Sequence, residues 1–356
     1  MKKKIHIIAP YPFGQAPSQR FRFEQYIEHF KTNGFEITFH PFLSNKTWKT
    51  LYKEGHVIQK GLGILGSFIK RIFLLFKLIN AKHIFIHREA THLGPPFFEW
   101  ILAKILRKKY IYDFDDATWL PNYSASNARF HRLKAYWKVK YCIKWAHQVT
   151  AGNAYLVDYA RQFNPNVSII PTTIDTENHH NKTIDFDKKR ITIGWTGTHT
   201  TMHYLEFIVP ILQQLETKFE FDFIVISNQE PIWKLKSLHF IKWKKETEIE
   251  DLLKIGIGIM PLVKDQWSVG KCGFKALQYM ALGIPTVLSP VGVNTTIVTH
   301  NKNGLLATTA DEWEGCLTQL LDSAALRKKL GKQGQETVHN HYAVKSNLDK
   351  YLSLFE

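Results

Sequence analysis

Short apolar runs alternate with longer amphipathic segments along almost the whole chain. Runs without polar alternation are typical of buried parallel strands, and segments with a period near 3.6 are typical of helices that cover a sheet. In the first half this pattern predicts strands at Lys4–Pro10, Phe35–His40, Lys82–His87, Tyr110–Phe114, His147–Ala151 and Val167–Ile170. It predicts helices between them at Ser18–Thr32, Phe97–Arg107, Arg132–Trp145 and Asn153–Phe163.

The same alternation restarts near residue 190. It predicts strands at Ile191–Trp195, Phe221–Ser227, Leu238–Lys242, Ile255–Met260 and Ile284–Leu288. It predicts helices at Met202–Leu215, Thr247–Lys254, Lys271–Leu282, Asp311–Leu321 and Ala324–Glu356. Two such runs predict an α/β protein with two tandem Rossmann-like, doubly wound parallel-sheet domains. Such sheets bind ligands at the carboxyl ends of their strands, so we expect a site in the cleft between the domains.

Residues 171–190 are polar and carry no strand or helix pattern, so they are the expected linker. This sets a first domain at 1–172, a second at 190–335, and a terminal helix at 336–356 that packs back toward the first domain. His179 and His180 lie in the linker without a third neighbouring ligand. They are therefore more typical of a solvated loop than of a metal site, and we expect no metal.

The positive charge is confined to the first half. The chain has 356 residues and a net charge of +16. Residues 1–170 contain 26 Lys and Arg against 10 Asp and Glu, whereas residues 171–356 contain 21 of each. A one-sided positive field indicates an anionic partner: a membrane surface, a nucleic acid or a phosphorylated substrate.

Two basic segments carry aromatic or aliphatic faces. Gly61–Ile79 holds Lys70, Arg71 and Lys77, which makes it a poor membrane span. It is consistent with an interfacial amphipathic helix and equally with an ordinary helix that faces the core. Arg132–Trp145 is consistent with contact to anionic lipid head groups and, at least as well, with a solvated basic face.

The three cysteines are widely spaced and form neither a metal pattern nor a disulfide framework, which favours a reducing, cytoplasmic setting. The apolar run that follows Met1 is only a few residues long, so we read it as a first strand and not as a signal peptide.

The stretch Gly256–Asn294 holds the strongest candidate chemistry. It predicts a buried strand, a loop at 264–270, a helix ended by Gly283, and a further strand. Lys271, Lys275 and Gln278 are spaced to share one face of that helix. Two ammonium groups near a helix N-terminus, after a parallel strand, predict a site for a phosphate-bearing ligand.

The order of several motifs resembles one enzyme family from end to end. The most specific segment is Gly270–Asn294, with its Lys-Cys-Gly-Phe-Lys helix start and Met-Ala-Leu-Gly-Ile-Pro-Thr run. Supporting segments are Pro17–Arg22, Gly94–Pro96, Asp113–Asp116, Gly152–Tyr155, Ile170–Asp175, Ile193–Gly197 and Glu248–Pro261. Together they are similar to glycosyltransferase family 4, the "glycosyl transferases group 1" type, with the GT-B fold.

The resemblance implies retaining transfer of a sugar from a nucleotide-sugar to an acceptor, without metal or cofactor. The donor, with a UDP-sugar as the leading expectation, would bind the second domain. The acceptor, a glycan or lipid-linked precursor, would bind the basic first domain. Acceptors of this kind imply peripheral attachment to the cytoplasmic face of the cell membrane.

The chain departs from the family pattern in two ways. The family carries two glutamates eight residues apart, where this chain has Gly270 and Gln278. The family also holds the diphosphate with an Arg and a Lys, yet the loop Gly197–His203 contains neither. Lys271 and Lys275 are the nearest substitutes, so we expect them to neutralise the departing diphosphate and to act in catalysis. Gln278 retains the ability to bond a ribose hydroxyl.

The remaining candidate residues follow strand ends. In the first domain, Asp115 stands near the position of a family histidine that contacts the donor sugar, and we expect it to act in catalysis. The expected donor contacts are completed by Gly14, Gly197, Thr198 and His199. The expected acceptor or phosphate contacts are Arg20, Arg22, His87, Arg88 and Glu89.

Other functions stay open. The loss of the first motif glutamate favours a catalytically silent GT-B subunit that binds a membrane or a partner glycosyltransferase. A nucleic-acid binder is compatible with the charge, but no such motif is present, and we expect no nucleic-acid partner. A nucleotide-sugar epimerase of the same fold is a more distant alternative.

Overall fold

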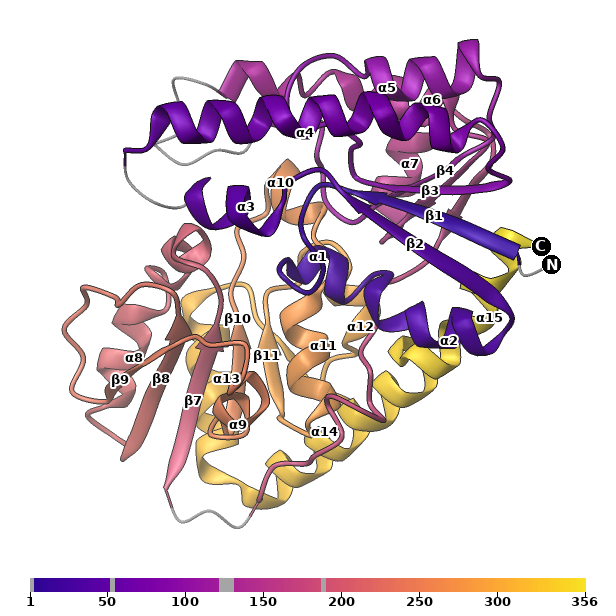
Figure 1. The fold of residues 1–356 in the computed structure, drawn as a ribbon. Coiled ribbons are helices and arrows are strands. Elements are labelled where there is room, and N and C mark those ends of the chain that lie inside the picture. Colours follow the sequence, from indigo (N-terminus) through magenta and orange to yellow (C-terminus); the bar gives the residue numbers. More distant parts are fainter. Residues whose placement is uncertain (1–2, 52–54, 122–130, 187–189) are drawn as a thin grey trace. The chain divides into compact units, whose positions relative to one another are not determined.

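The computed structural model describes residues 3–51, 55–121, 131–186 and 190–356. It divides into two units, Met1–Thr172 with Leu348–Glu356, and Thr173–Asn347 (Figure 1). Each unit contains one six-stranded parallel sheet covered by helices. The predicted α/β architecture with two doubly wound sheets is therefore confirmed.

The first unit has the strand order β2-β1-β3-β4-β5-β6. In β1 the residues Ile5, Ile7 and Ile8 are buried, as expected for a central parallel strand. The register places Ile7 opposite Phe39 on one side and Phe85 on the other. The strands are β1 Lys3–Ala9, β2 Phe35–Pro41, β3 His83–His87, β4 Ile111–Phe114, β5 Gln148–Ala151 and β6 Val167–Ile169.

The helices of this unit are more broken than predicted. They are α1 Pro17–Arg20, α2 Ile27–Thr32, α3 Asn45–Leu51, α4 Val57–Leu78, α5 Phe97–Trp100, α6 Lys138–Trp145 and α7 Ala154–Arg161. The helix expected over Ser18–Thr32 is interrupted by a 3₁₀ turn at Glu24–Tyr26, and it begins one residue earlier, with Ala16 at the N-cap and Pro17 in the first turn.

Backbone geometry explains two further breaks. Ala135 has a φ of +51°, a conformation that no helix interior contains, and it separates a 3₁₀ segment at His131–Lys134 from α6. The helix predicted at Phe97–Arg107 continues past α5 as a π-helical turn at Ile101–Ile105 and ends before Arg107, whose φ is +49°. None of the described helices has the length and apolarity needed to cross a membrane.

The second unit has the strand order β12-β11-β10-β7-β8-β9. Trp195 and Trp313 are fully buried in its core between sheet and helices. The strands are β7 Ile191–Thr196, β8 Phe221–Ser227, β9 Leu238–Lys242, β10 Ile257–Met260, β11 Thr286–Leu288 and β12 Leu305–Leu306. The helices are α8 Val209–Leu215, α9 Glu248–Leu252, α10 Gln266–Val269, α11 Phe274–Ala281, α12 Asn294–Ile297, α13 Ala310–Asp322 and α14 Ala324–Thr337.

The loop expected at 264–270 contains α10, and the helix expected from Met202 begins as a 3₁₀ segment at His199–Leu205. That segment gives way to α8 at Val209, where Pro210 occupies the first turn that tolerates proline.

The C-terminal segment completes the first unit. Helix α15 Val344–Leu352 contains the boundary between the units, and a 3₁₀ turn at Ser353–Phe355 follows it. The Tyr351 ring lies 4.2 Å from that of Tyr26, and the Phe355 ring lies 5.6 Å from that of Phe30. Tyr351 and Phe355 are both buried, so these last residues are part of the core of the first unit.

Candidate functional site

The direction in which the chain adds strands to the second sheet reverses between β7 and β10. From β7 the chain moves outward through β8 to β9, and it then returns to β10, β11 and β12 on the other side. In an open parallel sheet, ligands bind in the crevice outside the carboxyl ends of two such strands. The residues after β7 and the helix α11 after β10 therefore frame the candidate donor site of this unit.

Gly197 and Lys275 lie together at this edge. A Cβ at Gly197 would stand 2.9 Å from Cε of Lys275 and closer still to the indole of Trp195, so a larger residue would not fit without movement. The Lys275 ammonium lies 5.4 Å from the Trp195 ring centroid, within range of a cation–π attraction. The Thr196 N–H donates to the Tyr279 hydroxyl over 2.9 Å, which ties the end of β7 to α11.

Lys271 is placed differently from the prediction. Helix α11 begins at Phe274, so it contains Lys275 and Gln278, whereas Lys271 lies before its first residue. Gly273 explains the break, because its φ is +67° and a Cβ there would collide with a neighbouring isoleucine side chain. The Lys271 ammonium instead lies 5.7 Å from the ring of Trp267 in α10.

Gln278 belongs to a buried polar cluster. Its amide nitrogen lies 3.4 Å from Nε2 of His180, and both residues are almost fully buried, at 2% and 1% exposure. His180 in turn lies 3.0 Å from His179, whose Nε2 is 3.9 Å from the Glu248 carboxylate. The prediction of a solvated histidine loop is therefore wrong for His180.

The loop after β7 is held by a residue that sequence reasoning missed. The backbone N–H of His199 donates to Oδ1 of Asn228 over 2.9 Å, and the ring Nδ1 of His199 lies 2.9 Å from the Asn228 amide nitrogen. The hydroxyls of Thr198 and Thr200 are 2.8 Å apart. Because Asn228 follows β8, which neighbours β7, its position after a parallel strand was the signal that could have identified it.

In the first unit the direction in which the chain adds strands to the sheet reverses between β1 and β3. Behind this edge, Asp113 at the end of β4 collects several donors. Arg22 donates to both of its carboxylate oxygens, the His87 Nδ1 lies 2.7 Å from one of them, and the Thr150 hydroxyl donates over 2.7 Å. Burial alone would raise the pKa of Asp113, but Arg22 and His87 outweigh it and hold the pKa well below its usual range.

The burial of Arg22 and His87 corrects two expectations. Arg22 is fully buried and also donates to the carbonyl of Ile170, while His87 has no exposed surface. Neither side chain reaches solvent where it could meet a phosphate or an acceptor. Arg22 neutralises Asp113, and the two side chains together join three strand ends, because an unpaired buried carboxylate would be strongly destabilising.

Arg88 and Glu89 lie closer to the edge and are also paired. Arg88 donates from Nε to Asp115 over 2.6 Å and from Nη2 to Asp116. Burial lowers the pKa of Arg88, but the two aspartates outweigh it and raise the pKa well above its usual value. Glu89 lies 2.8 Å from the ammonium of Lys138. Asp115, the predicted catalytic carboxylate, is thus held in a bond to Arg88.

Gly14 and Arg20 stand on either side of the turn after β1. Gly14 has a φ of +72°, and its N–H donates to the Glu24 carboxylate over 2.8 Å. The same carboxylate accepts a bond of 2.9 Å from Gln19. Arg20 is largely buried, and its guanidinium carbon lies 4.9 Å from the Phe21 ring. Glu24 therefore shapes the loop in which a ligand would meet the carboxyl end of β1.

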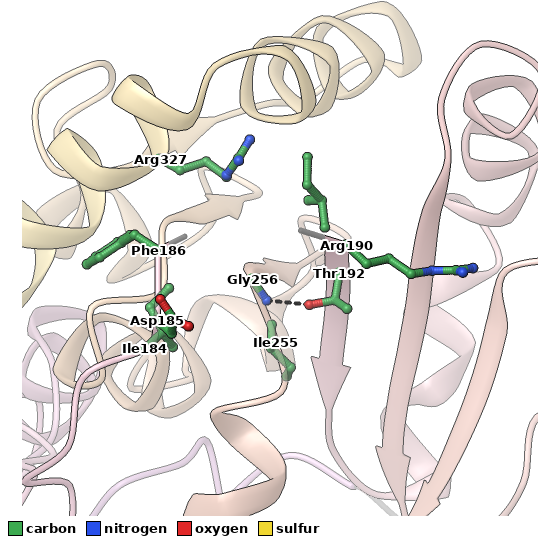
Figure 2. Close-up of a pocket in the computed structure, with 9 residues that line it drawn as sticks. Ile184, Asp185, Phe186, Arg190, Thr192, Ile255, Gly256 and Arg327 are labelled. Atoms are coloured by element: carbon green, nitrogen blue, oxygen red, sulfur yellow. Dashed lines mark hydrogen bonds between the residues drawn. The ribbon is translucent and has the colours of Figure 1, made fainter. Parts of the chain in front are cut away.

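A hollow at the opposite end of the second sheet is not a ligand site. It lies at the start of β7 and before β10, where the Gly256 N–H donates to the Thr192 hydroxyl over 2.7 Å (Figure 2). Its volume of about 20 Å³ holds about one water. The arginines beside it are engaged elsewhere, Arg190 with Asp222 and Arg327 with the Leu320 carbonyl. Within the described residues, no group of three or more His, Cys, Asp or Glu is placed to hold a metal ion.

Comparison with known proteins agrees with this architecture. Residues 233–337, which include α11, match the family model described as glycosyl transferases group 1. No curated protein sequence matches the chain.

Solved structures resemble the whole chain. The sucrose-phosphate synthase of Thermosynechococcus elongatus superposes with a TM-score of 0.73 at 13% identity, covering 99% of this chain and 98% of that one. Anabaena HepE in complex with UDP-glucose has a TM-score of 0.64 at 12% identity, covering 99% of both chains. The catalytic domain of Arabidopsis thaliana starch synthase IV, bound to ADP and acarbose, has a TM-score of 0.67 at 10% identity, covering 99% and 98%. At such low identity these similarities establish the fold, which is that of the GT-B glycosyltransferases.

Proposed function

We propose that this protein is a glycosyltransferase that moves a sugar from a nucleotide-sugar to an acceptor with retention of configuration. The observation that carries the proposal is the Lys275 ammonium, held over Trp195 beside Gly197 where the second sheet changes direction. A cation beside a glycine, whose lack of a side chain allows close approach, suits a diphosphate at that edge. The match of residues 233–337 to the group 1 family supports the same assignment.

In this proposal the two lysines replace the charge that the loop after β7 lacks. Lys275 neutralises the diphosphate as it leaves, and Lys271 contributes from the turn before α11. Metal-independent transfer follows, since the ammonium groups supply the stabilising charge. Thr198 and the ring of His199, both exposed at this edge, complete the donor contacts. Gln278 bonds the ribose and exchanges its contact with His180 for one with the sugar hydroxyl.

The acceptor is assigned to the first unit because its charge is positive. Asp115 is proposed to orient the acceptor hydroxyl or to steady charge at the anomeric carbon, with Arg88 holding its carboxylate in place. Arg20, Arg88 and Glu89 contribute charge and polarity at the same edge. We assign no general base.

A UDP-sugar is the proposed donor, since HepE was solved with UDP-glucose, although starch synthase IV was solved with ADP. A hexose is the proposed sugar.

The acceptor is proposed to be a lipid-linked or surface-glycan precursor at the cytoplasmic face of a membrane. Helix α4 supports this assignment because it carries an exposed apolar stripe and no acidic residue. The exposed members of the stripe are Ile58, Leu62, Leu65, Ile69, Ile72, Phe76 and Ile79. Lysines beside such a stripe favour peripheral binding to anionic lipid.

The test is nucleoside diphosphate release from UDP-, GDP- and ADP-sugars, with thermal shift to rank the nucleotides. We expect one nucleotide to raise the melting temperature and its sugar to be turned over, with Lys275→Met impaired in both. No binding and no turnover across the panel would contradict the proposal.

A second candidate is a catalytically silent subunit that binds a membrane or a partner glycosyltransferase. Gly270, which cannot supply the carboxylate expected at its position, favours it. Nucleotide binding without turnover in the presence of extracted membrane lipids would support this candidate instead.

A further inference from the structure

The first unit contains an apolar cavity of about 540 Å³ that is lined by α4 and by the segment that begins with α5. Both helices are labelled in Figure 1. Small-molecule sites in proteins have volumes of this order and mostly apolar walls. Its lining residues on the two helical walls include Phe68, Ile72 and Leu75 from α4 and Phe97, Phe98 and Ile101 from the other side.

The polar groups around the cavity are bonded to backbone. Arg71 lines it, yet its three guanidinium nitrogens donate to the carbonyls of Ala90, His40 and Ala9 over 2.7–2.9 Å. Glu99 accepts the N–H of Ala90 over 2.9 Å. These bonds hold the loop after β3 between α4 and α5. They also leave a wall that offers apolar surface, which is a poor site for a sugar or a nucleotide.

The cavity opens among exposed apolar side chains. Ile72, Phe97 and Leu133 all line it, and they expose 57%, 65% and 55% of their surface. Ile72 belongs to the exposed stripe of α4, whose members recur at alternating spacings of four and three residues. Between residues 55 and 88 the chain contains no Asp or Glu, while Lys70 and Lys77 are exposed. A second copy of so cationic a helix would be repelled, so the charge favours an anionic lipid surface.

The loop after β3 joins this cavity to the proposed acceptor edge. It begins with Arg88 and Glu89 at the carboxyl end of the strand, and it continues through Thr91, Leu93 and Gly94 into the cavity wall. The Lys138 ammonium contacts both parts, because it pairs with Glu89 and donates to the Thr91 carbonyl over 2.7 Å. A molecule with a polar head at the strand end and an apolar tail would therefore find both parts on one loop.

We propose that this cavity binds the hydrocarbon chain of the lipid-linked acceptor. The proposal rests on the proposed function for the identity of the acceptor. The chain enters past Ile72, Phe97 and Leu133, and the phosphate-bearing head lies toward Arg88.

The first test is a series of alkyl phosphates from 6 to 20 carbons, used below their micelle concentration, that displace a dansylated undecanoic acid from the full-length protein. Each buried methylene strengthens binding about fourfold. We expect affinity to rise with chain length and to level off once the chain fills the cavity. A rise that continues through the whole series would indicate adsorption to the exposed surface and would overturn the proposal, as would absence of binding.

The second test compares Ile72→Trp with Ile69→Trp. Both residues belong to the exposed stripe of α4, but only Ile72 lines the cavity. We expect Ile72→Trp to weaken binding of the dodecyl phosphate at least tenfold and Ile69→Trp to change it less than twofold. Equal effects of the two variants would refute a specific chain site. Matching melting temperatures check that both variants fold.

A competition experiment distinguishes the two sources of such a hydrocarbon chain, an isoprenoid-linked acceptor and a membrane phospholipid. Farnesyl phosphate, an isoprenoid with a single phosphate, is expected to displace the probe at least tenfold better than lauroyl lysophosphatidylglycerol. Equal or better displacement by the lysophospholipid would overturn the assignment to the acceptor. Binding of UDP, measured without lipid, is expected to be the same in Ile72→Trp and wild type, so failure of this site can be told apart from failure of the donor site.

Discussion

Replacing Lys275 with methionine separates donor binding from folding. The substitution keeps the aliphatic stem that packs beside Gly197 and Trp195 and removes the ammonium. A hydrogen bond to a charged group contributes about 1.5–3 kcal/mol, so loss of the Lys275 contact should weaken binding of UDP about 10- to 150-fold. The cation–π contact with Trp195 contributes about 0.5–1 kcal/mol to stability, which corresponds to a fall of about 1–4 °C in melting temperature.

Titration calorimetry with UDP and thermal unfolding of the same samples measure the two effects. Lys140→Met is the matched control, because its ammonium lies 5.0 Å from the Tyr141 ring in the first unit and makes the same kind of contact away from the donor edge. We expect it to leave the affinity for UDP unchanged. A UDP affinity of Lys275→Met within threefold of wild type would refute the reasoning. A fall in melting temperature beyond about 8 °C together with lost binding would show that Lys275 is structural.

Three other predictions concern the first unit. Asp113→Asn should destabilise the first unit by about 3–5 kcal/mol in urea unfolding, because Arg22 would stay buried without its counter-charge. The control Asp158→Asn, at an exposed position, should change stability by less than about 0.5 kcal/mol. Equal effects of the two variants would contradict the buried pairing. Burial, His6 and Arg71 lower the pKa of His40 to about 3, so the imidazole stays neutral in the folded protein. Its contribution to the free energy of unfolding is therefore complete above about pH 6.5 and declines as the pH falls from 6.5 toward 3. Between pH 7 and 5 we expect a loss of about 2 kcal/mol, reduced in His40→Gln, and an unchanged slope in that variant would show that other groups are responsible. Phe76→Glu on the exposed stripe of α4 should reduce flotation with anionic vesicles at least fivefold relative to Lys328→Glu in α14, and equal flotation would count against membrane binding through α4.

Strands β1 to β11 could be predicted from the sequence because each contains an apolar run, whereas the two-residue β12 at Leu305–Leu306 is too short to give such a pattern and was not predicted. The pairing of Gly197 with Lys275 was also accessible, since one follows the first strand of its domain and the other lies on the helix after a later strand. Parallel sheets bring those two positions to one edge whatever the detailed register. The candidate donor site is therefore the part of the molecule that the pattern of elements predicts best.

The errors have local or long-range causes. Lys271 was predicted to lie on the helix because the amino-acid sequence does not show that Gly273 has a positive φ. The convergence of Arg22 and His87 on Asp113 depends on side chains 91 and 26 positions away meeting in the fold. One signal was available: an aspartate within the apolar run that ends at Phe114 requires a buried cation, and the nearby arginines were the candidates.

The contribution of residues 348–356 to the first unit has a consequence for biosynthesis. The N-terminal unit lacks Tyr351 and Phe355 until residues 348–356 have been translated. Until then the aromatic surface of Tyr26 and Phe30 stays uncovered on the nascent chain, while the second unit already has nearly all of its residues. The order of synthesis would thus let the second unit mature first, and the first unit would be the one that needs protection from aggregation on the ribosome.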